Sequence, residues 1–166
     1  MTALSPEQTE QLVNSIVALL KQRERAVFAV CQSDLAKGLS PSVYVQHAHL
    51  HIQQPDLGFM KQLACADTQH AAVCTVLEAW SFGIQVHVSI HRQLLNALPV
   101  RALSSLPLTL SDHTGLAVYL CAHKVIGYAD VISLQPGLLL IDSRSLVTAL
   151  ASDVLKQRHI HWIRSE

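Results

Sequence analysis

The chain has 166 residues, half of them hydrophobic and only 14% charged, and its 12 basic residues balance its 12 acidic ones. This length indicates a single domain with a substantial core, and the low polarity excludes a largely disordered chain. Zero net charge and the absence of a ~20-residue apolar run exclude a nucleic-acid-binding or membrane-spanning protein, whereas the weakly charged surface is compatible with protein partners or a homo-oligomer.

The first predicted element is a helix within residues 1–25. Ser5 can cap it, Pro6 suits the first helical position and Gln8 completes a capping box. Apolar residues then recur at helical spacing and form one narrow stripe, Leu12, Val13, Ile16, Val17 and Leu20. Two interpretations stay open: a helix that packs on the following domain, or a docking helix that lays its stripe in a partner's groove.

Residues 26–31 predict a short strand and residues 43–52 a second one. On one face of the second strand the side chains of His47, His49 and His51 would follow each other at about 7 Å. That spacing is long for one Zn²⁺, whose nitrogen ligands bind at about 2.1 Å, and no HExxH or zinc-finger spacing accompanies it. The three histidines are therefore metal candidates only, a histidine-rich exposed face is the simpler interpretation, and we predict no cofactor.

The clearest pattern is a helix over residues 68–82, a turn at Gly83 and a strand over residues 84–90; a shorter helix over residues 57–66 precedes it. The helix has a core stripe of Val73, Val76, Leu77 and Trp80. Ile84, Val86, Val88 and Ile90 share one face of the strand, and Gln85, His87, Ser89 and His91 share the other. A helix–glycine–strand unit of this kind is typical of an α/β domain.

Beyond it the pattern predicts a hairpin of residues 108–110 and 116–121, a buried strand over residues 138–141 and a strand over residues 160–163. A helix is expected between them, from Ser143 or Ser145 to Arg158, with four inward residues, Leu146, Ala149, Leu150 and Val154. The predicted fold is α/β (or α+β), a single domain over residues 26–166. Its sheet is mixed and mainly parallel, with flanking helices and one antiparallel hairpin.

Catalytic signatures are missing from the sequence. Ser89 does not lie in a GxSxG motif, and neither GxGxxG nor GxxxxGK[ST] occurs. The four cysteines form no CxxC pair, which favours reduced, mostly buried thiols in a cytosolic protein. We predict that the protein is not an enzyme. The alternative is a metal- or flavin-binding module, or an enzyme, that uses the histidine-rich strand face.

Three stretches resemble a known family: FGIQVHVSIHRQLLNALPVRALSSLPLTL (residues 82–110), YADVISL (residues 128–134) and SLVTALASDVLKQRHIHWI (residues 145–163). They are similar to the PduM family, assembly proteins of the bacterial microcompartment for 1,2-propanediol degradation. The resemblance implies a structural protein of this cytoplasmic organelle that links shell proteins with interior contents. Shell proteins and encapsulated enzymes would be its partners.

The resemblance also gives the helix within residues 1–25 a sharper meaning. Short amphipathic helices at protein termini direct cargo into such shells. This helix is therefore expected to be an encapsulation helix whose stripe docks on a shell subunit. The absence of a linker between Arg25 and the strand at Ala26 counts against docking and leaves the other interpretation open, in which the helix packs on its own domain.

Overall fold

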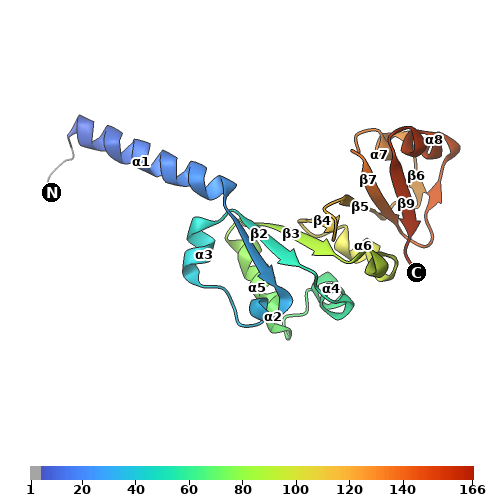
Figure 1. Ribbon diagram of the computed structural model, residues 1–166, viewed down its shortest axis with the longest axis horizontal. Coiled ribbons are helices and arrows are strands. Elements are labelled where there is room, and N and C mark those ends of the chain that lie inside the picture. Colours follow the sequence, from blue (N-terminus) through green and yellow to red (C-terminus); the bar gives the residue numbers. More distant parts are fainter. Residues whose placement is uncertain (1–4) are drawn as a thin grey trace.

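A seven-stranded sheet organises the protein in the computed structural model, which describes residues 5–166 (Figure 1). The strand order is β1-β2-β3-β4-β5-β7-β9. Every neighbouring pair is parallel except β4–β5. The strands are β1 (Val27–Cys31), β2 (His49–Gln53), β3 (Gln85–Ile90), β4 (Leu108–Asp112), β5 (Ala117–Cys121), β7 (Gly137–Ile141) and β9 (Ile160–Arg164). The predicted mixed, mainly parallel α/β sheet with one antiparallel hairpin is confirmed.

The antiparallel step decides which face of the sheet is covered. Right-handed crossovers between β1, β2, β3 and β4 place all their helices on one face of the sheet. After the hairpin the strands run in the opposite direction. The same handedness therefore places the helices that follow on the opposite face. The first group is α2 (Gln32–Leu35), α3 (Pro41–Gln46), α4 (Leu57–Ala64), α5 (Ala71–Ser81), the 3₁₀ helix η1 (Arg92–Ala97) and α6 (Val100–Leu103). The second group is α7 (Tyr128–Val131) and α8 (Ala149–Gln157), with a small parallel pair of β6 (Val125–Ile126) and β8 (Leu146–Val147).

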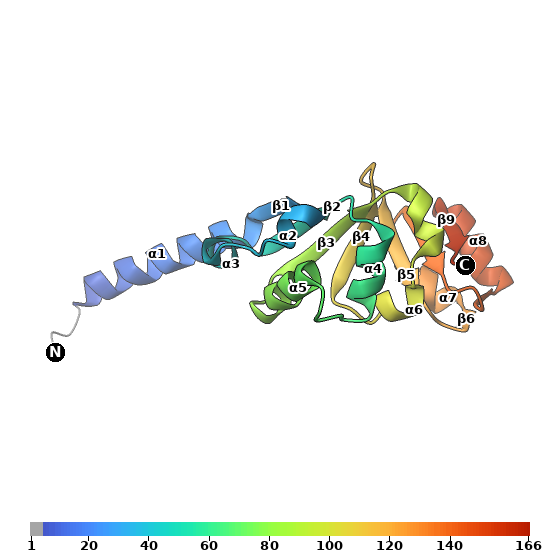
Figure 2. The same ribbon diagram turned by 90° about the horizontal axis from the view of Figure 1, so that it is seen from below.

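Two hydrophobic cores follow from this arrangement. The larger lies under α2 to α6 and includes Val76, Val86 and Val88, while the smaller lies under α7 and α8 and includes Leu139 and Val154. In Figure 2, α4, α5 and α6 lie in front of β3, β4 and β5. Within residues 5–166, no helix covers the opposite face of β1 to β4.

The predicted helix–glycine–strand unit is confirmed in detail. Helix α5 ends at Ser81, and Gly83 turns the chain with φ +72°, a conformation that costs glycine little. Four residues, Ile84, Val86, Val88 and Ile90, are buried, each at most 3% exposed, whereas Gln85 and His91 are exposed. The alternation therefore marked the buried face of β3 correctly.

The predicted strand over residues 43–52 is wrong in its first half. Ser40 accepts a hydrogen bond from the Ser42 backbone N–H and Pro41 occupies the first turn, so Pro41–Gln46 forms helix α3. Only His49–Gln53 is strand, and His47 ends the helix. The three histidines thus do not form one row.

The last helix also begins later than predicted. Leu146 pairs in β8, and Thr148 caps α8 by accepting a hydrogen bond from the Ala151 backbone N–H. The buried residues of α8 are Ala151, Val154 and Leu155; of the predicted inward set only Val154 is buried, and Leu146 and Leu150 are exposed. In residues 5–166 no helix is long and apolar enough to cross a membrane.

Candidate functional site

Helix α1 (Pro6–Arg25) projects from the body of the protein, with its N-terminal end farthest from the sheet (Figures 1 and 2). Ser5 and Gln8 form the predicted capping box. None of the residues of α1 is buried, and the five stripe residues, Leu12, Val13, Ile16, Val17 and Leu20, are 41–57% exposed. Leu19, which the stripe did not include, is more exposed still. The first four residues of the predicted 1–25 segment lie outside the described part of the chain.

The C-terminal end of α1 is held by hydrogen bonds to the domain. The Arg23 guanidinium donates to the carbonyl oxygens of Tyr44 and Phe82, at 3.3 and 3.4 Å. The Ala48 backbone N–H donates to the Arg23 carbonyl at 3.1 Å. His49 Nε2 donates to the Glu24 carbonyl at 3.0 Å. These contacts satisfy carbonyl groups that a helix end leaves free. The C-terminal end of α1 is therefore fixed on the domain, whereas its stripe stays exposed to solvent.

A rigid aromatic pair lies under these contacts. The rings of Tyr44 and Phe82 stack with centroids 4.8 Å apart, and the Tyr44 hydroxyl hydrogen bonds to the Glu78 carboxylate at 2.9 Å. Burial, together with the Glu78 carboxylate, raises the pKa of Tyr44 to about 12. Tyr44 therefore stays a neutral donor at physiological pH and fixes the surface from which α1 leaves.

The uncovered face of β1 to β4 carries a polar network at its centre. His51 Nε2 lies 3.0 Å from Ser89 Oγ, and the two ring nitrogens of His87 lie 2.8 Å from Thr109 Oγ1 and 2.9 Å from Ser111 Oγ. The rings of His51 and His87 are 5.0 Å apart. Burial lowers the pKa of the His87 imidazole, and the neighbouring His51 lowers it further, so the neutral ring is favoured.

The structure separates the three histidines that the sequence grouped as metal candidates. His47 donates from Nδ1 to the Val43 carbonyl and packs edge-on against Phe28, His49 bonds to the end of α1, and His51 bonds to Ser89. Within residues 5–166 no cluster of three or more histidine, cysteine or acidic side chains is placed to hold a metal ion. Each of these histidines has instead a hydrogen-bonding role.

A cavity of about 1090 Å³ opens where β4 and β5 diverge. These strands pair only through Leu110 with Val118 and Ser111 with Ala117, so they separate beyond that point. The cavity is lined by His51, His87 and Ser89, and also by leucines of β4 and of the α6–β4 connection. Sequence reasoning missed it because the divergence of two strands has no local sequence signal.

Asp112, at the end of β4, also lines this cavity and is 1% exposed. Its Oδ1 accepts from the Thr114 backbone and hydroxyl, at 2.9 and 2.6 Å, and from the Leu116 backbone at 2.9 Å. Desolvation by burial raises its pKa, but these hydrogen bonds outweigh it and hold the pKa below its ordinary value. Among the described residues Oδ2 has no hydrogen-bond partner. A buried carboxylate oxygen of this kind requires a donor.

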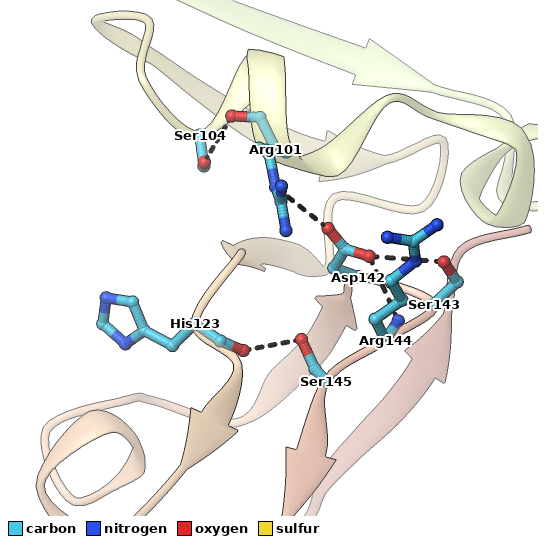
Figure 3. Close-up of polar contacts among 7 residues, drawn as sticks. All are labelled: Arg101, Ser104, His123, Asp142, Ser143, Arg144 and Ser145. Carbon is cyan, nitrogen blue, oxygen red and sulfur yellow. Dashed lines mark hydrogen bonds and ion pairs between the residues drawn. The ribbon is translucent and has the colours of Figure 1, made fainter.

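A second polar cluster joins the two halves of the sheet (Figure 3). Arg101 of α6 reaches Asp142, after β7, with Nε 3.3 Å from Oδ2. Asp142 Oδ1 accepts from the Arg144 backbone at 3.1 Å, and this bond, together with the charge of Arg101, lowers the pKa of Asp142. Ser145 Oγ donates to the His123 carbonyl at 2.6 Å. The cluster is a structural tie between α6 and the loop after β7.

The cysteines differ from expectation. Cys31, Cys65 and Cys74 are exposed and Cys121 is half-buried, so the prediction of mostly buried thiols is wrong. All four are free thiols. Burial raises the pKa of the Cys121 thiol, which disfavours the reactive thiolate form.

Comparison with known proteins gives the same assignment along nearly the whole chain. A family model described as "Putative propanediol utilisation" matches residues 11–161. The bacterial microcompartment assembly protein PduM of Salmonella typhimurium is 36% identical over 163 residues, which cover 98% of this chain and 100% of that protein. The protein of the same name from Citrobacter freundii is 34% identical over 165 residues, with the same coverage. No solved structure matches the chain.

These matches first give the class of the protein, which is a bacterial microcompartment protein of propanediol utilisation. Within that class, the chain belongs to the PduM family. The matched region includes both the stripe of α1 and the polar face of β2 to β4, so both belong to the family's shared length.

Proposed function

We propose that the protein is a non-enzymatic assembly component of the propanediol microcompartment and that α1 docks it on a shell protein. The two curated relatives are assembly proteins by name, which supports the structural role. One observation supports the docking: a 20-residue helix exposes all five of its stripe residues, Leu12, Val13, Ile16, Val17 and Leu20, to solvent. An apolar stripe of this kind is the usual anchor of a helix that binds in a groove.

The energy available from the stripe suits a reversible contact. Its side chains are about half exposed, and covering five of them would contribute on the order of 5 kcal/mol before the costs of association. The remaining domain, residues 26–166, would then face the interior contents of the compartment, where encapsulated enzymes are the expected partners.

The direct test replaces Ile16 and Leu20 by Glu in the full-length protein. We expect loss of co-purification with shell proteins, because two carboxylates would have to be buried in the groove. The thermal midpoint of the domain should not change, since neither residue is buried. The readout is a pull-down against individual shell proteins, with thermal unfolding measured in parallel.

The matched control is Asn14→Glu with Ala18→Glu. This pair has the same four-residue spacing and the same added charge, but it lies on the opposite face of α1. It should keep the shell contact. Retention of shell binding by the Ile16/Leu20 variant would refute docking through the stripe, and insolubility of that variant would show that α1 belongs to the core.

The same variants distinguish a shell partner from a second copy of the chain. If the stripe pairs with itself, the Ile16/Leu20 variant will convert a dimer to a monomer in analytical ultracentrifugation without shell protein present. A protein that is monomeric with and without the substitutions leaves the stripe free for the shell.

A further inference from the structure

The cavity between β4 and β5 is not used by the docking helix, and its chemistry is distinctive. Its lining residues, all within the described part of the chain, include no Lys and no Arg. They supply instead imidazole, hydroxyl and amide groups, and one buried acid, Asp112. A phosphate or carboxylate would find no cation here, so the cavity disfavours anionic ligands.

Its polar groups hydrogen bond to one another, and their hydroxyl groups keep further donor or acceptor capacity. His51 and Ser89 form one pair, at 3.0 Å, and His87 is held between Thr109 and Ser111. Neutral imidazoles and hydroxyls can each donate or accept, and the Gln53 and Gln54 amides at the rim do both. This mixture fits hydroxyl groups, which also donate and accept.

Asp112 adds a requirement that hydroxyl groups meet. Its Oδ1 is occupied by Thr114 and Leu116, whereas Oδ2 is buried and has no partner in residues 5–166. A ligand O–H that donates to Oδ2 would satisfy it. The leucines of the cavity and the ring of Tyr119 offer apolar surface for the carbon skeleton of the same ligand.

From these observations we propose that the cavity is a binding site for an uncharged polyhydroxylated molecule, a sugar or polyol. One hydroxyl donates to Asp112 Oδ2, and others bond to the His51–Ser89 pair. The volume of about 1090 Å³ accommodates a ligand of sugar size or larger. The site does not depend on docking by α1 and lies on other elements.

Titration of the full-length protein, with its His imidazoles isotope-labelled, tests the proposal by NMR. The probes are 1,2-propanediol, glycerol, ribose and glucose, with ribose 5-phosphate and glucose 6-phosphate as charged counterparts. At least one uncharged probe should shift the His51 and His87 signals with saturation, and its phosphorylated counterpart should bind at least about tenfold more weakly because no cation lines the cavity. If no uncharged probe shifts either signal up to about 50 mM, or if the phosphorylated probes bind as well, the proposal is wrong.

Two variants locate the binding. Asp112→Asn keeps an oxygen to accept from Thr114 and Leu116 but replaces the acceptor Oδ2 by an amide, and Ser89→Ala removes one hydroxyl. Each should weaken binding about tenfold. The controls Asp153→Asn and Ser105→Ala change exposed residues outside the cavity and should leave affinity unchanged. Equal affinity of Asp112→Asn and the unmodified protein would overturn the assignment of this site.

Discussion

Helices α1 and α5 have the same kind of apolar stripe but opposite surroundings. In α5 the residues Ala72, Val73, Val76 and Ala79 are fully buried, whereas no described residue of α1 is buried. The difference comes from chain topology: α5 crosses between the parallel neighbours β2 and β3 and must pack on the sheet, while α1 precedes the first strand. Amphipathic spacing thus identifies a binding face without identifying what covers it.

The largest expected effect comes from placing the same substitution in both helices. Val76→Glu should destabilise the domain by more than about 4 kcal/mol, because it buries a carboxylate in the larger core. Val17→Glu should change the free energy of unfolding by less than about 0.5 kcal/mol. Urea unfolding measures both. Comparable losses would show that α1 packs on the domain.

The next largest expected effect is a difference in amide hydrogen exchange between α1 and α5. An isolated helix of this length is marginally stable in water, so α1 amides should exchange about a thousandfold faster than those of α5. If α1 docks on a shell protein as proposed, addition of that protein should slow exchange in α1 alone. Equal protection of the two helices in the free protein would contradict the exposed position of α1.

A smaller effect is expected from Arg23→Ala. It removes the two hydrogen bonds to Tyr44 and Phe82 and should cost about 1 kcal/mol. Residual dipolar couplings of α1 and of the sheet should fit one alignment tensor in the unmodified protein and two in the variant. Lys21 is exposed and its side chain makes no such bond within residues 5–166, so Lys21→Ala should keep a single tensor.

The smallest expected effect is a dependence of stability on pH that arises from the uncovered face of β1 to β4. The pKa of His87 is lower in the folded protein than the ordinary histidine value of about 6.5, so the unfolded chain binds the proton more readily. The free energy of unfolding should therefore fall as the pH decreases through about 6.5, and level off below the folded pKa. His87→Gln should show a smaller fall between pH 7.5 and 5.5, measured as urea midpoints. An identical fall would assign the effect to other groups.

Much of the fold was predictable because the local patterns there agree with the topology. The alternation from Ile84 to Ile90 and the turn at Gly83 indicate the position of β3, and the polar turn before Gly115 indicates the β4–β5 hairpin. The α3 error was avoidable in part: Ser40-Pro41 is the same start signal as Ser5-Pro6, but the β-branched residues after it favour a strand.

The candidate sites were predictable only to a smaller extent. The stripe of α1 follows from periodicity, but its exposure depends on the path of the whole chain. The cavity depends on where β4 and β5 diverge, and Asp112 gives no sign in the sequence that one of its oxygens is buried without a partner. Tertiary placement of this kind cannot be predicted from the local spacing of residues.

The single antiparallel step at β4–β5 has a consequence for the route of folding. On each side of it, the strands follow sequence order across the sheet, but parallel partners lie far apart along the chain, as Val27 with His49 and His49 with Gln85 do. Among the strand pairs of residues 5–166, the β4–β5 hairpin alone joins residues as near in sequence as Leu110 and Val118. Contacts of short sequence separation form quickly, so the two parallel arrays can each assemble outward from the hairpin. We therefore expect this sheet to fold faster than a sheet of the same size whose strand order skips sequence neighbours.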